Sequence, residues 1–365
     1  MIAHIEVQTE QGSGFQALGN SSYLNLGYLS WAGITAGKAP SFYSFVGGGD
    51  NWNNFLSPDR KGFNQPNLLA YTASFGGGFS ATISAESQYS SSGPGTNMTG
   101  AAGTNPGAIT FGGTRWPDIV GALHVKQGWG EAQISGVIHN VNVKDYTYYD
   151  ATGCGYYSVL AACDASESKV GWGLDAGVKF NLPWYPGDNF LVTGAYSQNA
   201  VWYAGMGGGE MMWGEGGQVG GNGQPMYLAD AYFNPLTNQW STPRAWSVTA
   251  QLEHHWTPTF YTDLLGSVGG INWSNMNGYV CTAPGVCSGT GVLSPKALTW
   301  IVGTDIGWNP VTNLNFDLEL MYQSTHQDQP TAFQGTVYSN GIYVPGAWEG
   351  SSSGFAGRLR ITRYF

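Results

Sequence analysis

The clearest pattern in the chain runs from residue 170 to residue 182 and reads VGWGLDAGVKFNL. Its apolar side chains occupy every second position: Val170, Trp172, Leu174, Ala176, Val178, Phe180 and Leu182. The positions between them hold Gly171, Gly173, Asp175, Gly177, Lys179 and Asn181. Successive side chains of a β-strand point to opposite faces, so this spacing predicts a strand with one apolar and one polar face.

The same alternation recurs along the chain, for example at 246–253, 298–306 and 314–323. A soluble sandwich of two sheets also alternates, but its polar face would be rich in Lys and Glu. Here the polar face consists of Gly, Ser, Thr and Asn with isolated charges. We predict about fourteen strands, at approximately residues 2–10, 22–32, 34–40, 67–75, 78–88, 118–127, 130–143, 170–182, 189–200, 244–256, 259–273, 297–308, 313–323 and 353–365.

The connections between these strands alternate between short and long. Short turns fall at 76–78, 127–130, 183–188, 257–259 and 310–312, and long Gly-rich segments at about 89–117, 144–169, 201–242, 276–296 and 324–352. Tight turns at one end and long loops at the other are typical of outer-membrane β-barrels. We therefore predict an all-β fold, a transmembrane antiparallel β-barrel that forms a single domain over residues 1–365 and is surrounded by outer-membrane lipid and lipopolysaccharide.

The composition agrees with a barrel. Charged residues make up 10% of the 365 residues and hydrophobic residues 42%, whereas soluble chains carry roughly 25% charged residues. No run of about 18 apolar residues offers a membrane-spanning helix, which leaves a closed barrel as the way to pair every backbone group in a bilayer. The net charge of −10 excludes nucleic acid as a partner, because phosphate binding requires basic surfaces.

The two ends of the chain carry further signals. In the last predicted strand Phe355, Leu359, Ile361 and Phe365 alternate with Arg358, Arg360, Thr362 and Tyr364. An amphipathic strand that ends on Phe resembles the C-terminal signal by which outer-membrane proteins are recognised for assembly. The first residues, MIAHIE, lack the basic and apolar regions of a signal peptide. We therefore expect the sequence to be mature, recloned or truncated.

Several short motifs carry a family resemblance: LSWAGITAGK at 29–38, SFYSF at 41–45, NLLAYTASF at 67–75, GWGLDAGVK at 171–179 and the closing RLRITRYF at 358–365. Through them the whole chain resembles the alphaproteobacterial porin family typified by rhizobial and Brucella porins. The resemblance implies a sixteen-stranded barrel, a homotrimer, and a constriction loop that folds into the lumen after the fifth strand.

The segment that corresponds to the constriction loop, at about 41–66, follows only the third predicted strand. The resemblance therefore implies that about 14 of an inferred 16 strands are present and that the N-terminal hairpin and signal peptide are missing. Either the strand at 2–10 then pairs with the one at 353–365, or an edge of the sheet stays open. The charged residues at this loop are the first candidates for a pore constriction: Lys38, Asp50, Asp59, Arg60 and Lys61.

In a porin the polar face of each strand lines a water-filled channel, so the alternation also predicts which charges point inward. The expected pore-wall residues are Glu86, Lys126, Glu131, Asp175, Lys179, Glu253, Asp263, Asp305, Asp317, Glu319, Arg358 and Arg360. Opposed acidic and basic walls would order water across the channel, and the excess of acids predicts a weak preference for cations. For any single residue the simpler interpretation is that it only solvates a wide lumen.

The chain offers no catalytic or metal-binding motif, and we expect no cofactor. Cys154 and Cys163 share one predicted outer loop and Cys281 and Cys287 another, so we expect two disulfides within loops rather than free thiols or a metal site. His254 and His255 point to opposite faces of one strand, with His254 on the lipid face, and cannot chelate one ion. An outer-membrane esterase would need an outward Ser beside His254, which no neighbouring strand clearly offers.

Three functions fit these expectations to different degrees. A general diffusion porin for small hydrophilic solutes and ions is favoured. A solute-specific channel would have a denser ladder of aromatic or basic side chains in the pore. A structural or adhesive barrel that acts through its outer loops is the third possibility, although so wide a barrel would still conduct.

Overall fold

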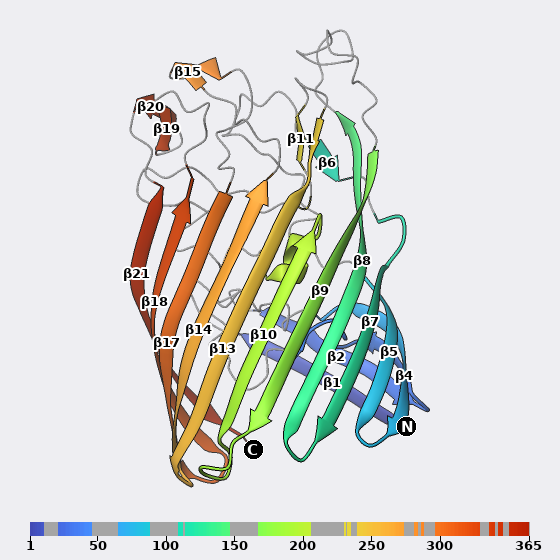
Figure 1. The fold of residues 1–365 in the computed structure, drawn as a ribbon, viewed down its shortest axis with the longest axis vertical. Coiled ribbons are helices and arrows are strands. Elements are labelled where there is room, and N and C mark those ends of the chain that lie inside the picture. The colour runs from blue at the N-terminus through green and yellow to red at the C-terminus, as the bar shows by residue number, and fades with distance from the viewer. Residues whose placement is uncertain are drawn as a thin grey trace.

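The computed structural model describes residues 1–10, 21–45, 65–87, 109–111, 114–146, 167–205, 230, 232–234, 239–273, 281–283, 286–287, 296–328, 336–339, 342–345 and 350–364. One antiparallel sheet of 15 strands dominates this part of the chain. Figure 1 shows it as a curved wall, with the tight turns at one end. No helix among the described residues is long and apolar enough to cross a membrane.

Fourteen of the strands follow one another around the sheet in chain order, and each is hydrogen-bonded to the next. They are β1 (Ile2–Glu10), β2 (Ser21–Trp31), β3 (Ile34–Lys38), β4 (Asn67–Gly76), β5 (Phe79–Glu86), β7 (Asp118–Gln127), β8 (Gly130–Tyr146), β9 (Glu167–Asn181), β10 (Asn189–Gln198), β13 (Pro243–Thr257), β14 (Phe260–Trp273), β17 (Lys296–Val311), β18 (Leu314–Gln327) and β21 (Ser351–Arg363). Each corresponds to one of the strands predicted from the alternation, so that prediction is confirmed.

Short elements lie in the predicted long connections. The fifteenth strand, β6 (Ile109–Phe111), pairs with β8. Three small hairpins are formed by β11 (Tyr232–Asn234) with β12 (Gln239–Ser241), β15 (Cys281–Ala283) with β16 (Val286–Cys287), and β19 (Thr336–Ser339) with β20 (Ile342–Pro345). Figure 1 shows β6, β11, β15, β19 and β20 at the end of the wall opposite to the tight turns. The 3₁₀ helix η2 (Val201–Ala204) follows β10.

The turn between β2 and β3 explains how two weakly patterned strands form. Ala32 and Gly33 have φ angles of 51° and 84°, and positive φ at both central residues is what a tight two-residue hairpin requires. Tyr71 and Thr72 on β4 lie against this turn, with the Thr72 amide donating to the Gly33 carbonyl at 2.8 Å. The turn thereby fixes the register of β2, β3 and β4.

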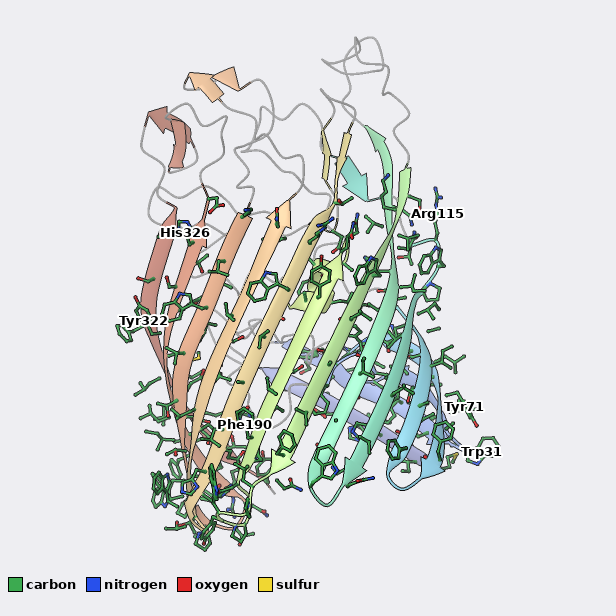
Figure 2. All side chains as sticks on the ribbon, in the orientation of Figure 1. Trp31, Tyr71, Arg115, Phe190, Tyr322 and His326 are labelled. Carbon is green, nitrogen blue, oxygen red and sulfur yellow. The ribbon has the colours of Figure 1, made fainter. Side chains whose placement is uncertain are left out.

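Burial along the strands is inverted relative to a soluble protein. On β9, Val170 and Leu174 are 63% and 53% exposed, whereas Asp175 is 2% exposed. The same reversal on β7 and β8 leaves Leu123 60% exposed and Ser135 3% exposed. Figure 2 shows the side chains along the wall. An apolar outer face and a sheltered polar inner face are what a barrel wall between lipid and water needs.

Aromatic residues gather beside the tight turns. Trp129, Trp184, Trp256, Trp308 and Tyr364 are all exposed and lie in or next to the turns or at the end of β21. Two further tryptophans lie elsewhere: Trp116 is half-buried in front of β7, and Trp273 ends β14.

The sheet has two edges. Within the described residues β1 pairs with β2 and β21 pairs with β18, and no ladder joins β1 to β21. Of the two alternatives that the sequence left, the described strands therefore show an open edge rather than a narrower closed ring.

Candidate functional site

The predicted pore-wall residues occupy the inner face to different depths. Asp175, Asp263, Asp305, Asp317, Glu319 and Glu86 are buried there. Lys126 and Arg360 are exposed, while the remaining members, Glu131, Lys179, Glu253 and Arg358, are half-buried. Of the predicted constriction residues, Lys38 is half-buried and donates to the Leu24 carbonyl at 2.7 Å. The others, Asp50, Asp59, Arg60 and Lys61, lie outside the described residues, as do Cys154 and Cys163.

Four carboxylates form a continuous row across β13, β14, β17 and β18, which we call the acidic row. The strand registers place Glu253 opposite Asp263, Asp263 opposite Asp305, and Asp305 opposite Glu319. Neighbouring strands lie about 4.8 Å apart, so these are adjacent like charges. Glu319 then meets Arg358 of β21, whose Nη2 donates to Glu319 Oε2 at 3.0 Å.

A second charged group lies nearer the tight turns on β7, β8 and β9. Glu131 Oε2 lies 3.3 Å from His124 Nε2 and 3.5 Å from Lys126 Nζ, and the register places Lys179 opposite Glu131. This group contains two lysines and one glutamate, whereas the acidic row on β13 to β18 contains four carboxylates. Basic side chains and the longest run of acidic ones therefore lie on different strands of the same inner face.

The first residues after β3 turn onto this inner face. The hydroxyl of Ser41 donates to Glu86 Oε2 at 2.6 Å, and the amide of Phe42 donates to Glu86 Oε1 at 3.1 Å. Three strands further on, on β9, the amide of Phe45 donates to Asp175 Oδ2 at 3.2 Å. Residues 41–45, with which the predicted constriction loop begins, thus run along the inner face of the sheet from β5 to β9.

Glycines on the inner face of β9 make room for this crossing. A Cβ at Gly177 would lie 2.2 Å from Phe45 Cδ1, and a Cβ at Gly173 would lie 3.0 Å from both the Tyr203 Cβ and the Tyr43 hydroxyl oxygen. The alternation placed these glycines on the polar face, but it did not reveal that they make room for Phe45, Tyr43 and Tyr203. Repeated glycine on the inner face of one strand was the available signal, because such positions let another backbone approach closely.

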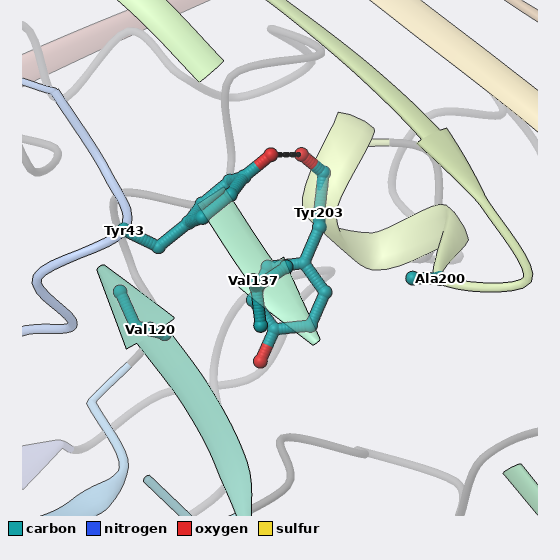
Figure 3. Packing of buried hydrophobic residues seen from close by; sticks show 5 residues of the cluster. All are labelled: Tyr43, Val120, Val137, Ala200 and Tyr203. Carbon is teal, nitrogen blue, oxygen red and sulfur yellow. Dashed lines mark hydrogen bonds between the residues drawn. The ribbon is translucent and has the colours of Figure 1, made fainter. Parts of the chain in front are cut away.

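The start of the segment after β10 also lies on the inner face. The sequence predicted 201–242 as an outer loop, and this is wrong for residues 201–205. There η2 packs against the wall: Tyr203 makes an edge-on contact with Tyr43 at 4.8 Å between ring centroids, and the Tyr43 hydroxyl donates to the Tyr203 carbonyl at 2.8 Å (Figure 3). We call residues 41–45 and 199–205 together the inner ledge.

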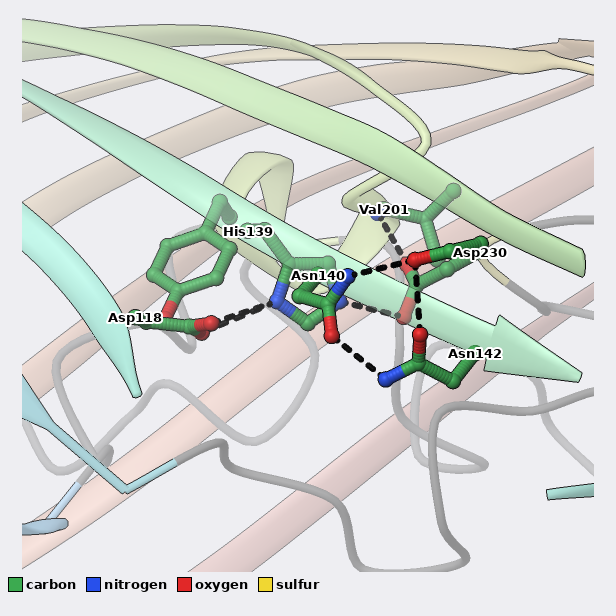
Figure 4. A network of polar contacts seen from close by, with 8 residues as sticks. Asp118, His139, Asn140, Asn142, Val201 and Asp230 are labelled. Carbon is green, nitrogen blue, oxygen red and sulfur yellow. Dashed lines mark hydrogen bonds and ion pairs between the residues drawn. The ribbon is translucent and has the colours of Figure 1, made fainter. Parts of the chain in front are cut away.

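A buried polar cluster fastens the inner ledge to the wall. His139 Nδ1 lies 2.9 Å from both carboxylate oxygens of Asp118, and His139 Nε2 lies 3.4 Å from Asp230 Oδ2 (Figure 4). Asp230 Oδ1 accepts the Val201 amide at 2.6 Å, and the Tyr203 hydroxyl donates to Asp118. Burial, reinforced by Asp118, raises the pKa of Tyr203 well above its ordinary value, which keeps this hydroxyl a donor.

This cluster, which we call the His139 cluster, was not predicted from the sequence. His139 has the same parity as Glu131 on β8, so the alternation could have placed it in the lumen. Asp118, at the start of β7, lies opposite Glu86 in the register. Asp230 is separated from both by a long stretch of chain, and no local pattern could have joined it to them.

At the end of the wall with the tight turns, Asp188 ties β10 to β13. Its Oδ2 lies 2.7 Å from His254 Nδ1, and its Oδ1 accepts the His255 amide at 2.7 Å. Burial opposes ionisation, but these hydrogen bonds and the two histidines hold the pKa of Asp188 below its ordinary 3.8. The His254 side chain, predicted to face lipid, thus bonds to Asp188 between Trp184 and Trp256, whereas the His255 ring bonds to Glu253 at 2.6 Å.

The remaining predicted residues are the cysteines of the outer loops. The register of β15 and β16 places Cys281 opposite Cys287. No group of three or more His, Cys, Asp or Glu side chains among the described residues is arranged to hold a metal ion.

Comparison with known proteins gives a family and a fold. A family model described as a porin subfamily matches residues 3–351. The outer membrane channel DcaP of Acinetobacter baumannii is similar in structure, with a TM-score of 0.56 and 12% identity over 98% of this chain and 80% of that chain. At this identity the similarity shows the fold alone.

Two further solved structures are similar at lower scores. OmpT, an outer membrane protein of Vibrio cholerae, has a TM-score of 0.47 and 8% identity over 94% of this chain and 81% of that chain. An anion-selective porin from Comamonas acidovorans has a TM-score of 0.43 and 11% identity over 93% and 77%. No curated protein matches the sequence.

Proposed function

Since the chain belongs to the porin subfamily and so is an outer-membrane β-barrel of the channel-forming kind, we propose that it forms a water-filled pore for the passive diffusion of small hydrophilic solutes and ions. The observation that supports this proposal best is the inverted burial of its strands. A sheltered face of Asp, Glu, Ser, Thr and Asn behind an apolar outer face suits a wall around water. We propose no enzymatic activity.

We further propose that the pore weakly prefers cations. The acidic row supports this, because adjacent carboxylates on β13 to β18 create a negative potential that attracts cations and repels anions. The constriction loop is proposed to contribute Asp50, Asp59, Arg60 and Lys61, with Lys38 at its base. The short motifs shared with rhizobial and Brucella porins support assignment to that branch of the family and assembly as a homotrimer.

Two loop disulfides remain part of the proposal. The opposition of Cys281 and Cys287 across β15 and β16 is compatible with one of them, and Cys154 with Cys163 would form the other. Mass mapping of the non-reduced, proteolysed protein should recover both pairs as linked peptides, and the recovery of alkylated free thiols would contradict the pairing.

Single-channel recording in a planar lipid bilayer tests the function. A diffusion porin should give large, linear currents, and its reversal potential in a salt gradient should have the sign of a cation-preferring pore. A current blocked at saturating concentration by one solute would instead indicate a solute-specific channel. If the correctly folded protein gave no current, the pore proposal would fail, and a structural or adhesive barrel would be the better description.

A further inference from the structure

We propose that His139 is a positioning residue for a proton-dependent constriction, an inference that rests on the proposed channel function. As an imidazolium between Asp118 and Asp230, it holds η2 on the inner wall. Loss of its proton releases η2 and widens the pore.

The geometry favours an imidazolium, because Nδ1 is hydrogen-bonded to Asp118 and Nε2 lies within ion-pair distance of Asp230, 3.4 Å from its Oδ2. Ionised carboxylates only accept hydrogen bonds, and a neutral imidazole carries one N–H. His139 faces Asp118 with Nδ1 and Asp230 with Nε2. The Tyr203 hydroxyl and the Val201 amide donate to the same two carboxylates, which therefore act as acceptors on this side too. Only the doubly protonated ring presents an N–H to Asp118 and a positive charge to Asp230.

The cluster is closed to water. The side chains of His139, Asp118 and Asp230 are 4%, 0% and 4% exposed. If the ring lost one proton, a nitrogen lone pair would face a buried carboxylate that no water could solvate. An uncompensated buried charge is strongly unfavourable, so the segment that can move would separate from the wall. The wall strands β7 and β8 are fixed by their ladders, which leaves η2 and Asp230 as the movable partners.

The charges around the cluster strengthen this response. Glu86 on β5 lies opposite Asp118, and Tyr43 of the inner ledge and Tyr203 of η2 are the other titratable groups packed there. Gly171 of β9 lies opposite His139 and adds no charge. Asp118 and Asp230 thus flank the imidazolium, and Glu86 lies beside Asp118, so deprotonation of His139 removes a positive charge that lies next to two carboxylates.

Release of η2 would be transmitted to residues 41–45. The Tyr43 hydroxyl bonds to the Tyr203 carbonyl, and the two rings are in contact. Because both halves of the inner ledge share this contact, loosening of η2 also removes a support from the start of the constriction loop. We therefore expect a wider channel rather than a local change without effect on the current.

The experiment measures single-channel conductance of the full-length protein from mildly acidic to alkaline pH. The wild type should step to a higher conductance as pH rises. His139→Gln, which cannot become cationic, should show the higher conductance at every pH and lose the step. His139→Lys, which restores a cation, should restore the lower conductance. His326→Gln is the matched control, because His326 is exposed at the far end of β18 with Asp328 at 3.5 Å and should leave the step unchanged.

Asp230→Asn provides a second route if His139→Gln does not fold. It keeps the shape of the side chain but removes one of the two negative charges that flank the imidazolium, so the step should again be lost. A wild-type conductance that does not change with pH, or a folded His139→Gln or Asp230→Asn protein that retains the step, would overturn the proposed role of His139 in the constriction while leaving the channel function intact. A folded protein without any conductance would overturn the channel function itself.

Discussion

Replacement of Gly177 by alanine should displace residues 41–45, the start of the proposed constriction loop, from the inner face while leaving the barrel wall intact. The new Cβ would lie 2.2 Å from Phe45 Cδ1 and 2.9 Å from Cε1, whereas carbon atoms in contact lie about 3.5–4.0 Å apart. Gly177 is held in a ladder with β8 and β10. The ring must therefore move, since the strand cannot.

The cost follows from what Phe45 gives up when it leaves the wall. Its side chain is 2% exposed, and burial of a Phe side chain contributes about 1.5–3 kcal/mol. The hydrogen bond from its amide to Asp175 contributes about 1.5–3 kcal/mol more, because the acceptor is charged. A local destabilisation of about 3 kcal/mol changes the ratio of seated to unseated loop by roughly 100-fold, which is enough to make the unseated form appear in single-channel records.

The assay compares single-channel conductance of Gly177→Ala with that of the wild type and of Gly121→Ala. Gly121 lies on the outer face of β7, and a Cβ there would meet no heavy atom within 4 Å, so this variant controls for the loss of a strand glycine. Gly177→Ala should change the conductance or its noise, and Gly121→Ala should not. If both variants match the wild type, the close approach of Phe45 to Gly177 does not hold residues 41–45 on the wall, and the reasoning from this contact is refuted.

Three further changes test other parts of the inner face. Arg358→Leu removes the ion-pair partner of the buried Glu319 and should destabilise the protein by about 3–5 kcal/mol, seen as a lower heat-unfolding temperature. Equal unfolding temperatures would show that this ion pair does not stabilise the fold. Asp305→Asn combined with Asp263→Asn should reduce cation preference, and an unchanged reversal potential would show that the acidic row does not set selectivity. Because the pKa of Asp188 is depressed, its stabilising effect is complete above its ordinary pKa of 3.8 and is lost as pH falls through the lower folded value. Asp188→Asn should therefore unfold more readily than the wild type at neutral pH, by about 1.5–3 kcal/mol for the lost charged hydrogen bonds, and the difference should shrink in strong acid; a constant difference would contradict this assignment.

Alternation in the sequence was sufficient to find the fourteen consecutive strands of the wall and the face of most of their side chains, whereas the short strands of the long connections were missed. Even β2 and β3, where the pattern is weak, formed near the predicted positions, because the Ala32–Gly33 turn pairs them and β4 continues the ladder. A period of two is a local property, and every strand displays it without knowledge of its neighbours.

The ledge could not be predicted in the same way. Its contacts join residues such as Tyr43 and Tyr203, or His139 and Asp230, that are far apart in sequence and meet only once the wall is curved. The acidic row was predicted residue by residue, yet its continuity depends on the registers of four strands. Side-chain alternation gives the face of a residue but not its height along the neighbouring strand.

The two faces of β9 can change independently. Leu174 and Val170 meet the hydrocarbon, whereas Gly171, Gly173, Asp175 and Gly177 determine how closely other segments approach from within. Substitutions at the inner positions should therefore alter the proposed pore while the lipid-facing side of the strand stays the same.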